Sequence, residues 1–242
     1  MTVGPSQQIR TLLAAVLRDA ATGDSPAFPA ADCAERLGLD GVTVCLLAAD
    51  GGTELLWYDK GDKHGPALAD LQYTLGEGPT PDAVGSGRAV LEGDLTQLPA
   101  LQWPGFRSAA LDAGILAAFA FPLRIGAIHL GAVTGYRALP GPLSEQQMSD
   151  ALAVAEALTL LLAARARHGP LNAPAETSGL HRAEVHQATG MLSVHLRIPL
   201  EQALLRLRAH AYSHDRPILD VAHDIITNRL RLDADTPHPP PG

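Results

Sequence analysis

The sequence predicts an α+β domain followed by an all-helical module. Up to about residue 167, helical periodicity alternates with short apolar runs rich in β-branched residues, whereas the residues after 179 show helical periodicity only. The segment HGPLNAPAETSG between them has two prolines, two glycines and no apolar period, which is typical of a domain boundary. These observations predict a first domain, a linker, a helical domain and a disordered Pro-rich tail, at residues 6–167, 168–179, 180–232 and 233–242.

One helix begins the first domain and another ends it. Apolar residues spaced at helical intervals between Ile9 and Leu17 form an amphipathic stripe. Ser144 with Gln147 predicts a capping box for a helix over 145–167. Apolar runs, separated by glycines and by a loop-rich middle, lie between the two helices. They predict a mostly antiparallel sheet, with helices on one face and the loop-rich middle on the other, from strands at 42–50, 53–59, 89–91, 115–125 and 127–137.

The C-terminal module contains three helical stripes, which begin at Val185, Leu200 and Ile218. Pro199 and Pro217 fit the first turns of the second and third helices, where a missing N–H group breaks no hydrogen bond. A bundle of about 55 residues is marginally stable alone, so we expect it to need a partner or to dimerise.

Composition and charge narrow the function classes. The 242 residues contain no apolar run near the roughly 18 to 20 residues that span a bilayer, no N-terminal signal pattern and only two cysteines. This predicts a cytoplasmic protein without membrane contact. The net charge of -8 falls entirely on residues 1–177, whereas residues 178–242 carry seven arginines and seven acids and are neutral. The neutral tail therefore lacks the bulk positive field of a strong phosphate-driven binder.

No sequence motif indicates catalysis. Phosphate-binding GxxxxGK[ST], acyl-transfer GxSxG and metal-binding HExxH or CxxC patterns are all missing. His210 and His214 are spaced to share one helix face and could bind a metal, but no third ligand accompanies them, so solvated or capping histidines are favoured. We predict no enzyme activity, no metal and no cofactor. The aromatic candidates for core filling or for lining a ligand pocket are Trp103, Phe106, Phe119 and Phe121.

Two long stretches resemble known families. LGEGPTPDAVGSGRAVLEGDL, LQWPGFRSAALDAGILAAFAFPL and LGAVTGYRALPGPLS resemble the GAF domains that precede ANTAR domains in actinobacterial regulators. The tail HRAEVHQATGMLSVHLRIPLEQALLRLRAHAYSHDRPILDVAHDII resembles ANTAR itself. The resemblance covers roughly residues 6–232. It implies a GAF-like sheet with flanking helices, a three-helix RNA-binding module that recognises tandem hairpins, and a homodimer.

Flat or cationic side chains on the helical module supply the groups that hairpin loops require. We expect His186 and Thr189 to lie on the outside of the first helix and Gly190 to permit close packing. Many ANTAR domains carry lysine where this chain has Thr189, and many related GAF domains carry cysteine where it has Thr80, which argues against a covalent role there. The predicted RNA-binding residues are Arg182, His186, Thr189, Arg206, Arg208 and His210.

The leading hypothesis is a transcription regulator in which the GAF domain senses a small ligand or a partner. The ANTAR domain then binds RNA hairpins and causes antitermination. In the alternative, the GAF domain is a sensor or scaffold, and the helical tail mediates protein association rather than RNA binding. An enzyme acting in the GAF-like cavity is the least favoured reading.

Overall fold

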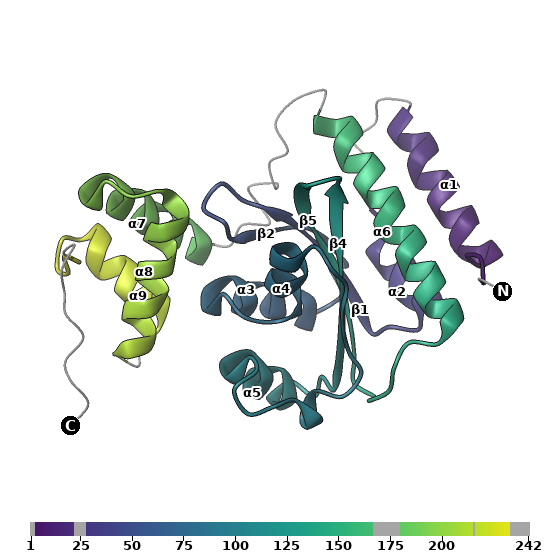
Figure 1. Ribbon diagram of the computed structural model, residues 1–242, viewed down its shortest axis with the longest axis horizontal. Helices are drawn as coiled ribbons and strands as arrows, with labels where there is room; N and C mark the ends of the chain where they lie inside the picture. Colours follow the sequence, from purple (N-terminus) through teal and green to yellow (C-terminus); the bar gives the residue numbers. More distant parts are fainter. Residues whose placement is uncertain (1–2, 22–27, 167–179, 215, 233–242) are drawn as a thin grey trace. The chain divides into compact units, whose positions relative to one another are not determined.

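The computed structural model describes residues 3–21, 28–166, 180–214 and 216–232 (Figure 1). The helices of the first compact unit are α1 (Gln7–Ala21), α2 (Ala30–Leu37), α3 (His64–Leu75), α4 (Pro79–Ser86), α5 (Pro104–Asp112) and α6 (Glu145–Ala166), with a 3-10 turn at Leu95–Gln97. Its strands are β1 (Gly41–Leu47), β2 (Thr53–Tyr58), β3 (Val90–Glu92), β4 (Ala117–Ile125) and β5 (Ile128–Arg137). The second unit contains α7 (Leu180–Leu196), α8 (Leu200–Ser213) and α9 (Ile218–Ile226). The predicted linker and Pro-rich tail lie outside the described residues, so the domain boundaries stay predictions.

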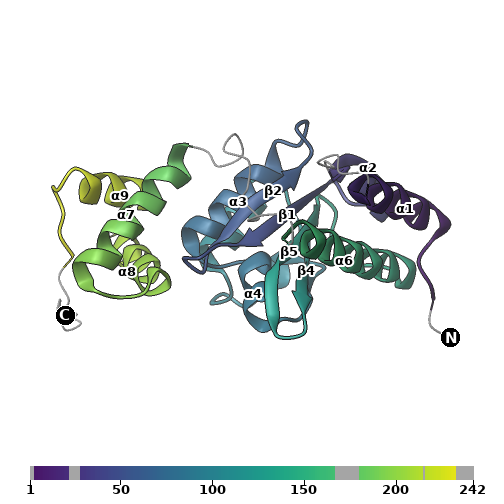
Figure 2. The ribbon, with the colours of Figure 1, turned by 90° about the horizontal axis from the view of Figure 1, so that it is seen from above.

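The five strands form one antiparallel sheet in the order β2-β1-β5-β4-β3 (Figure 2). The predicted strands at 42–50 and 53–59 pair as the β1–β2 hairpin, and those at 115–125 and 127–137 pair as the β4–β5 hairpin. β5 lies in the middle of the sheet and also pairs with β1, with Val133 opposite Val44. This pairing joins the two hairpins. This order confirms the α+β sheet that the sequence predicts.

Strand side chains alternate between two differently covered faces, as pleated strands require. On one face, α1, α2 and α6 cover a large apolar core that includes Val44, Phe119 and Leu123. On the other face, α3, α4 and α5 pack over smaller clusters that include Ala118 and Ala120. Figure 1 shows the two sets of helices on opposite sides of the strands. The loop-rich middle therefore covers its own face of the sheet, as predicted.

The predicted capping box begins α6. The backbone N–H of Gln147 donates to Ser144 Oγ at 3.2 Å, and the N–H of Ser144 donates to Gln147 Oε1 at 3.0 Å. Buried Asp150 accepts a hydrogen bond from the N–H of Ser6 at 2.6 Å and so fastens α6 to the start of α1. Within the described part, α6 is the one helix long and apolar enough to cross a membrane, but its buried residues pack in the core of this unit.

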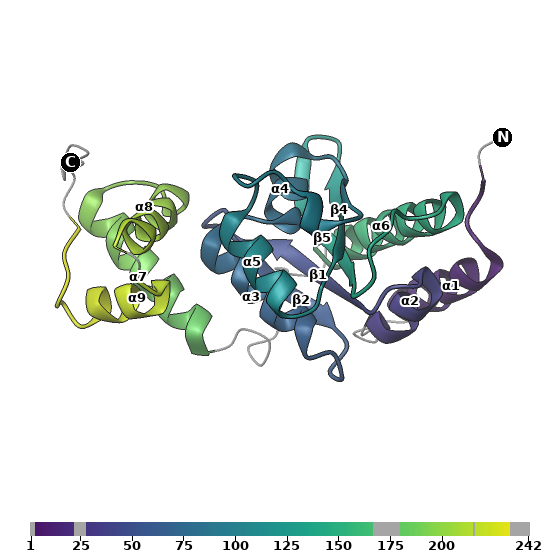
Figure 3. The same ribbon diagram turned by 90° about the horizontal axis from the view of Figure 1, so that it is seen from below.

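The helices of the second unit pack pairwise around one apolar core (Figure 3). Each helix contributes small and branched apolar residues at helical spacing, which confirms the three predicted stripes. Pro199 and Pro217 are the N-cap residues of α8 and α9, one position before the first turn that the sequence predicts. The most buried core residues are Val185, Ala188, Leu192, Ala203, Leu204, Leu207, Val221 and Ala222.

Candidate nucleic-acid interface and sensory face

The expectation that Thr189 lies on the outside of α7 is wrong. Its side chain is 1% exposed, and its hydroxyl donates to the carbonyl oxygen of Val185 at 2.7 Å. Thr189 therefore fills the bundle core, where its hydroxyl is not exposed at the surface. His186, three residues earlier, is partly exposed on the same helix. Arg182 belongs to the first turn of α7, and its side chain lies outside the described residues.

Gly190 does not serve close packing, contrary to expectation. A Cβ built at this position would meet no neighbouring atom of the described residues within 4 Å. The residue is only partly buried in the middle of α7. Glycine at this position therefore lowers the stability of the helix and does not allow a neighbouring helix to approach more closely.

We expect Gly190→Ala to stabilise the second unit by about 0.5 to 1 kcal/mol, because alanine loses less backbone entropy in a helix interior. Thermal melts of the full chain followed by far-UV circular dichroism would measure the change. A lower melting temperature for the variant would mean that a methyl group at this position meets an obstacle.

The predicted residues of α8 lie on two flanks of that helix. Ala203, Leu204 and Leu207 face the bundle core. Arg206 is exposed and Arg208 is partly buried. With 100° of rotation per residue, the two arginines lie on opposite sides of the outward face. α8 therefore presents a cation on each side of its exposed surface.

His210 and His214 stack on each other at the C-terminal end of α8. Their ring centroids are 4.0 Å apart with an interplanar angle of 24°, and His214 Nδ1 lies 2.9 Å from the carbonyl oxygen of His210. Burial lowers the pKa of His210 below its ordinary value, and the nearby His214 and Arg216 lower it further. Among the described residues no group of three histidine, cysteine or acidic side chains is placed to hold a metal ion.

The depressed pKa of His210 predicts an acid-sensitive second unit. As pH falls through the ordinary histidine pKa of about 6.5, the unfolded chain takes up the proton first, so stability decreases. His210→Gln should remove this part of the pH dependence, whereas His195→Gln, at an exposed position on α7, is the matched control. Thermal melts between about pH 7.5 and 5.5 would test it. Equal pH dependence in wild type and His210→Gln would contradict the prediction.

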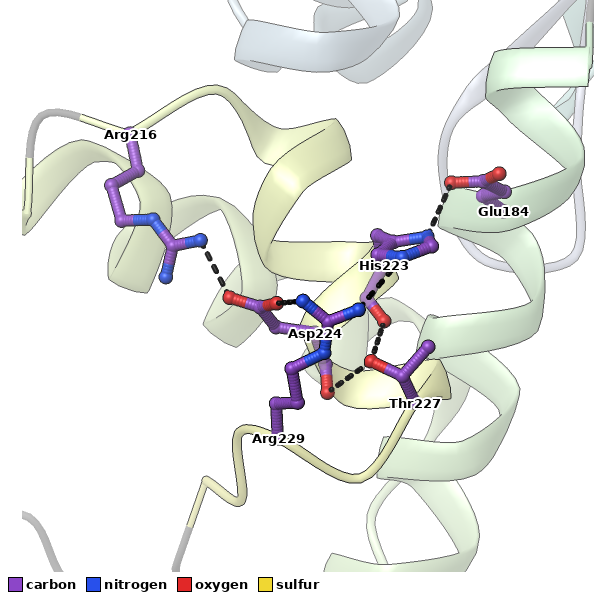
Figure 4. A network of polar contacts seen from close by, with 6 residues as sticks. All are labelled: Glu184, Arg216, His223, Asp224, Thr227 and Arg229. Atoms are coloured by element: carbon purple, nitrogen blue, oxygen red, sulfur yellow. Dashed lines mark hydrogen bonds and ion pairs between the residues drawn. The ribbon is translucent and has the colours of Figure 1, made fainter.

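Sequence reasoning missed a polar network that joins α7 and α9 with the segments just before and just after α9 (Figure 4). Arg216 Nη2 donates to Asp224 Oδ2 at 2.6 Å, and Arg229 Nη1 lies 3.7 Å from Asp224 Oδ1. Arg229 also approaches His223 Nε2 at 3.4 Å, while His223 Nδ1 lies 3.8 Å from Glu184 Oε2 on α7. The hydrogen bond from Arg216 holds the pKa of Asp224 below its ordinary value. Arg216 and Arg229 therefore stabilise the bundle itself. Their positions in the sequence do not indicate that both contact Asp224.

The four predicted pocket aromatics do not line one cavity. Phe119 and Phe121 point from β4 into the core under α1, α2 and α6, whereas Trp103 and Phe106 belong to the cluster on the opposite face. All four are at most 5% exposed. The prediction of a shared pocket fails because a sheet lies between the two pairs.

Trp103 and Phe106 fasten α5 to α4 and to the segment before it. Trp103 Nε1 donates to Asp82 Oδ2 at 2.9 Å, and the N–H of Phe106 donates to Glu77 Oε1 at 2.8 Å. Their rings meet edge to face with centroids 5.9 Å apart. Such contacts give these two residues a structural role.

Phe121 lines a groove of about 530 Å³ between the end of β4 and α6. Leu152 and Leu160 of α6 form one wall, and Arg124 and Glu156 contribute charged groups. Its volume lies within the range of small-molecule sites, roughly 300 to 1,000 Å³.

Thr80, in the first turn of α4, belongs to a buried polar cluster on the other face. Its hydroxyl lies 2.8 Å from that of Thr134, and its N–H donates to Gln72 Oε1 at 2.8 Å. Thr43 adds a longer hydrogen bond to the carbonyl oxygen of Thr134. These groups satisfy one another without a ligand.

The ANTAR domain model matches residues 175–226, which span all three helices of the second unit. The C-terminal helices are therefore similar to the ANTAR domain family. The first unit has the GAF fold, as the solved structures that resemble it show. No curated protein matches the chain in sequence.

Three solved structures illustrate the likeness of the GAF unit. The phycoerythrobilin-bound GAF domain of a cyanobacterial phytochrome has a TM-score of 0.53 and 12% identity, over 67% of this chain and 99% of that one. The GAF domain of an Acinetobacter phosphoenolpyruvate-protein phosphotransferase has a TM-score of 0.50 and 14% identity, over 67% and 98%. Free methionine-R-sulfoxide reductase from Neisseria meningitidis, in complex with its substrate, has a TM-score of 0.50 and 17% identity, over 69% and 99%. At these identities the likeness shows the fold alone.

Proposed function

We propose that this GAF-ANTAR protein is a cytoplasmic, signal-responsive transcription regulator. Its ANTAR domain binds tandem RNA hairpins as a homodimer and prevents termination, and its GAF domain senses a small ligand or a partner. The ANTAR match over residues 175–226 carries the proposal. We assign no catalytic step to either domain.

The surface of α8 supports RNA binding. The segment from Gln202 to His214 contains two arginines and two histidines and no acidic residue, although the whole C-terminal region is neutral. Two of the seven arginines of this region thus lie on a stretch of α8 without acidic residues. A local basic surface of this kind attracts phosphates without a net positive charge on the domain.

The groove beside Phe121 supports small-ligand sensing. α6 forms one of its walls and is the last described element before the ANTAR helices. A ligand in this groove would therefore contact the helix through which a signal leaves the GAF domain. Similar folds hold small molecules in the phytochrome and in the reductase complex.

Binding of the full-length protein to a tandem-hairpin RNA across a salt series tests the proposal. We expect tighter binding to the hairpins than to single-stranded RNA of matched length, and affinity that falls as salt rises. Equal affinity for the two RNAs would refute specific recognition. Recovery of protein partners that survives RNase treatment, without any RNA shift, would favour the alternative of protein association.

Arg208→Ala should weaken hairpin binding without unfolding the bundle. A lost phosphate contact lowers the affinity and reduces the salt slope by about 0.7 to 0.9. Unchanged affinity, or a melting temperature that falls as far as for a core truncation, would exclude a binding role for Arg208.

A further inference from the structure

Tyr212 is the one aromatic residue of the chain that lies open to solvent. The sequence has ten phenylalanine, tryptophan and tyrosine residues, and the other nine belong to the GAF unit, where they are buried or partly buried. Tyr212 is 83% exposed in the last turn of α8. Burial in the bundle therefore gives no reason for an aromatic side chain here.

Tyr212 ends a line of apolar side chains on the outward face of α8. Leu205 and Ala209 precede it by seven and three residues, a spacing that places all three on one side of a helix. Both are exposed, Leu205 to 65%, while the core residues Leu204 and Leu207 lie on the opposite side. Single exposed apolar residues are ordinary, but three on one side of a helix, with an aromatic at the end, are a candidate binding surface.

The charges around this line favour a polyanion as its partner. Arg206 lies on one side of the line and Arg208 on the other. The acid-free segment from Gln202 to His214 surrounds all three apolar residues. A protein surface with acidic side chains would meet the same cations but would not need a flat ring between them.

We propose that Tyr212 stacks on an unpaired nucleobase of an RNA hairpin loop, with Leu205 and Ala209 contacting the apolar edge of the adjoining nucleotide. Every base has a π-face, and loop bases splay outward where aromatic side chains can reach them. Arg206 and Arg208 then contact the phosphates on either side. This inference rests on the proposed RNA-binding function and assigns its stacking subsite.

The salt dependence of binding separates stacking from charge. Stacking releases no counterions, so Tyr212→Leu should weaken hairpin binding roughly five- to 150-fold with an unchanged salt slope. Arg206→Gln should weaken binding with a shallower slope, and Tyr212→Phe should bind like wild type because the ring is kept. Val194→Ala, which trims an exposed side chain of α7, is the matched control and should bind like wild type.

Fluorescence gives a direct readout of the stack. Full-length wild type and Tyr212→Phe should quench a tandem-hairpin RNA whose loop adenines are replaced by 2-aminopurine, and Tyr212→Leu should not. Equal affinity and equal quenching by wild type and Tyr212→Leu would overturn the inference while leaving RNA binding intact. If Tyr212→Leu leaves RNA binding unchanged but dissociates an oligomer in light scattering, the line is a protein interface and the inference also fails. Failure of wild type to prefer hairpin RNA would instead refute the proposed function itself.

Discussion

Leu207→Ala is expected to unfold the ANTAR helices at a much lower denaturant concentration than wild type requires. Leu207 is fully buried where α8 faces the other two helices, so truncation leaves a cavity that costs about 2 to 5 kcal/mol. A unit of about 50 residues has a total stability of roughly 3 to 8 kcal/mol, so this loss removes a large part of it. Hairpin RNA binding should then be lost together with the helical signal.

Leu205→Ala is the matched control for this truncation. It removes the same atoms from the same helix, but Leu205 is 65% exposed and leaves no cavity. We expect its melting temperature to stay close to that of wild type. Both tryptophans, Trp57 and Trp103, belong to the GAF unit, so tryptophan fluorescence monitors that unit separately while circular dichroism follows the helices. Equal loss of stability in the two variants would contradict the assignment of core and surface on α8.

Gly131→Ala is expected to disrupt the GAF sheet. Gly131 lies in β5 between β1 and β4 with φ of +155°, and a Cβ there would lie 1.9 Å from the carbonyl oxygen of Cys45. The obstacle is backbone, so the two strands must separate, at a cost of about 3 kcal/mol or more. Urea unfolding followed by tryptophan fluorescence would measure this loss.

Gly85→Ala provides the comparison for that experiment. Gly85 lies in α4, and a Cβ at this position would meet nothing within 4 Å among the described residues. Alanine is expected to raise the stability slightly, because it favours a helix more than glycine does. A Gly131→Ala variant as stable as Gly85→Ala would show that β5 and β1 do not approach so closely at this point.

Elements with a strong period could be predicted from the sequence. The strands of the β1–β2 and β4–β5 hairpins are apolar segments that glycines separate. The Ser144–Gln147 capping box begins a helix with a long apolar stripe. Two helices, α2 and α3, were not predicted. α2 has only eight residues, and α3 buries its residues against β1, β2 and α5. The buried residues of α2 do have helical spacing, but a helix of two turns is too short to be stable without tertiary contacts.

The candidate sites were harder to predict for a similar reason. Thr189 is polar, and a polar residue in a helix is usually solvated, but its hydroxyl bonds to the carbonyl oxygen one turn earlier and so can be buried. The four aromatics of the predicted pocket share a chemical type, but chemical type does not say where a side chain lies. Phe119 and Phe121 alternate on one strand and so share one face of the sheet, whereas Trp103 and Phe106 lie on the opposite face. The sequence alone does single out Tyr212, since it is the only phenylalanine, tryptophan or tyrosine after position 136.

The burial of α6 limits how a signal can travel. Eight of its residues are buried, and Leu158, Leu161 and Leu162 belong to the apolar core that also holds the sheet. Close-packed cores resist gradual deformation, so α6 cannot swing outward while the GAF domain stays folded. Any compound that acts through this helix must therefore change the free energy of unfolding of the whole GAF domain. A thermal-shift screen of the GAF tryptophan signal would therefore detect any such compound.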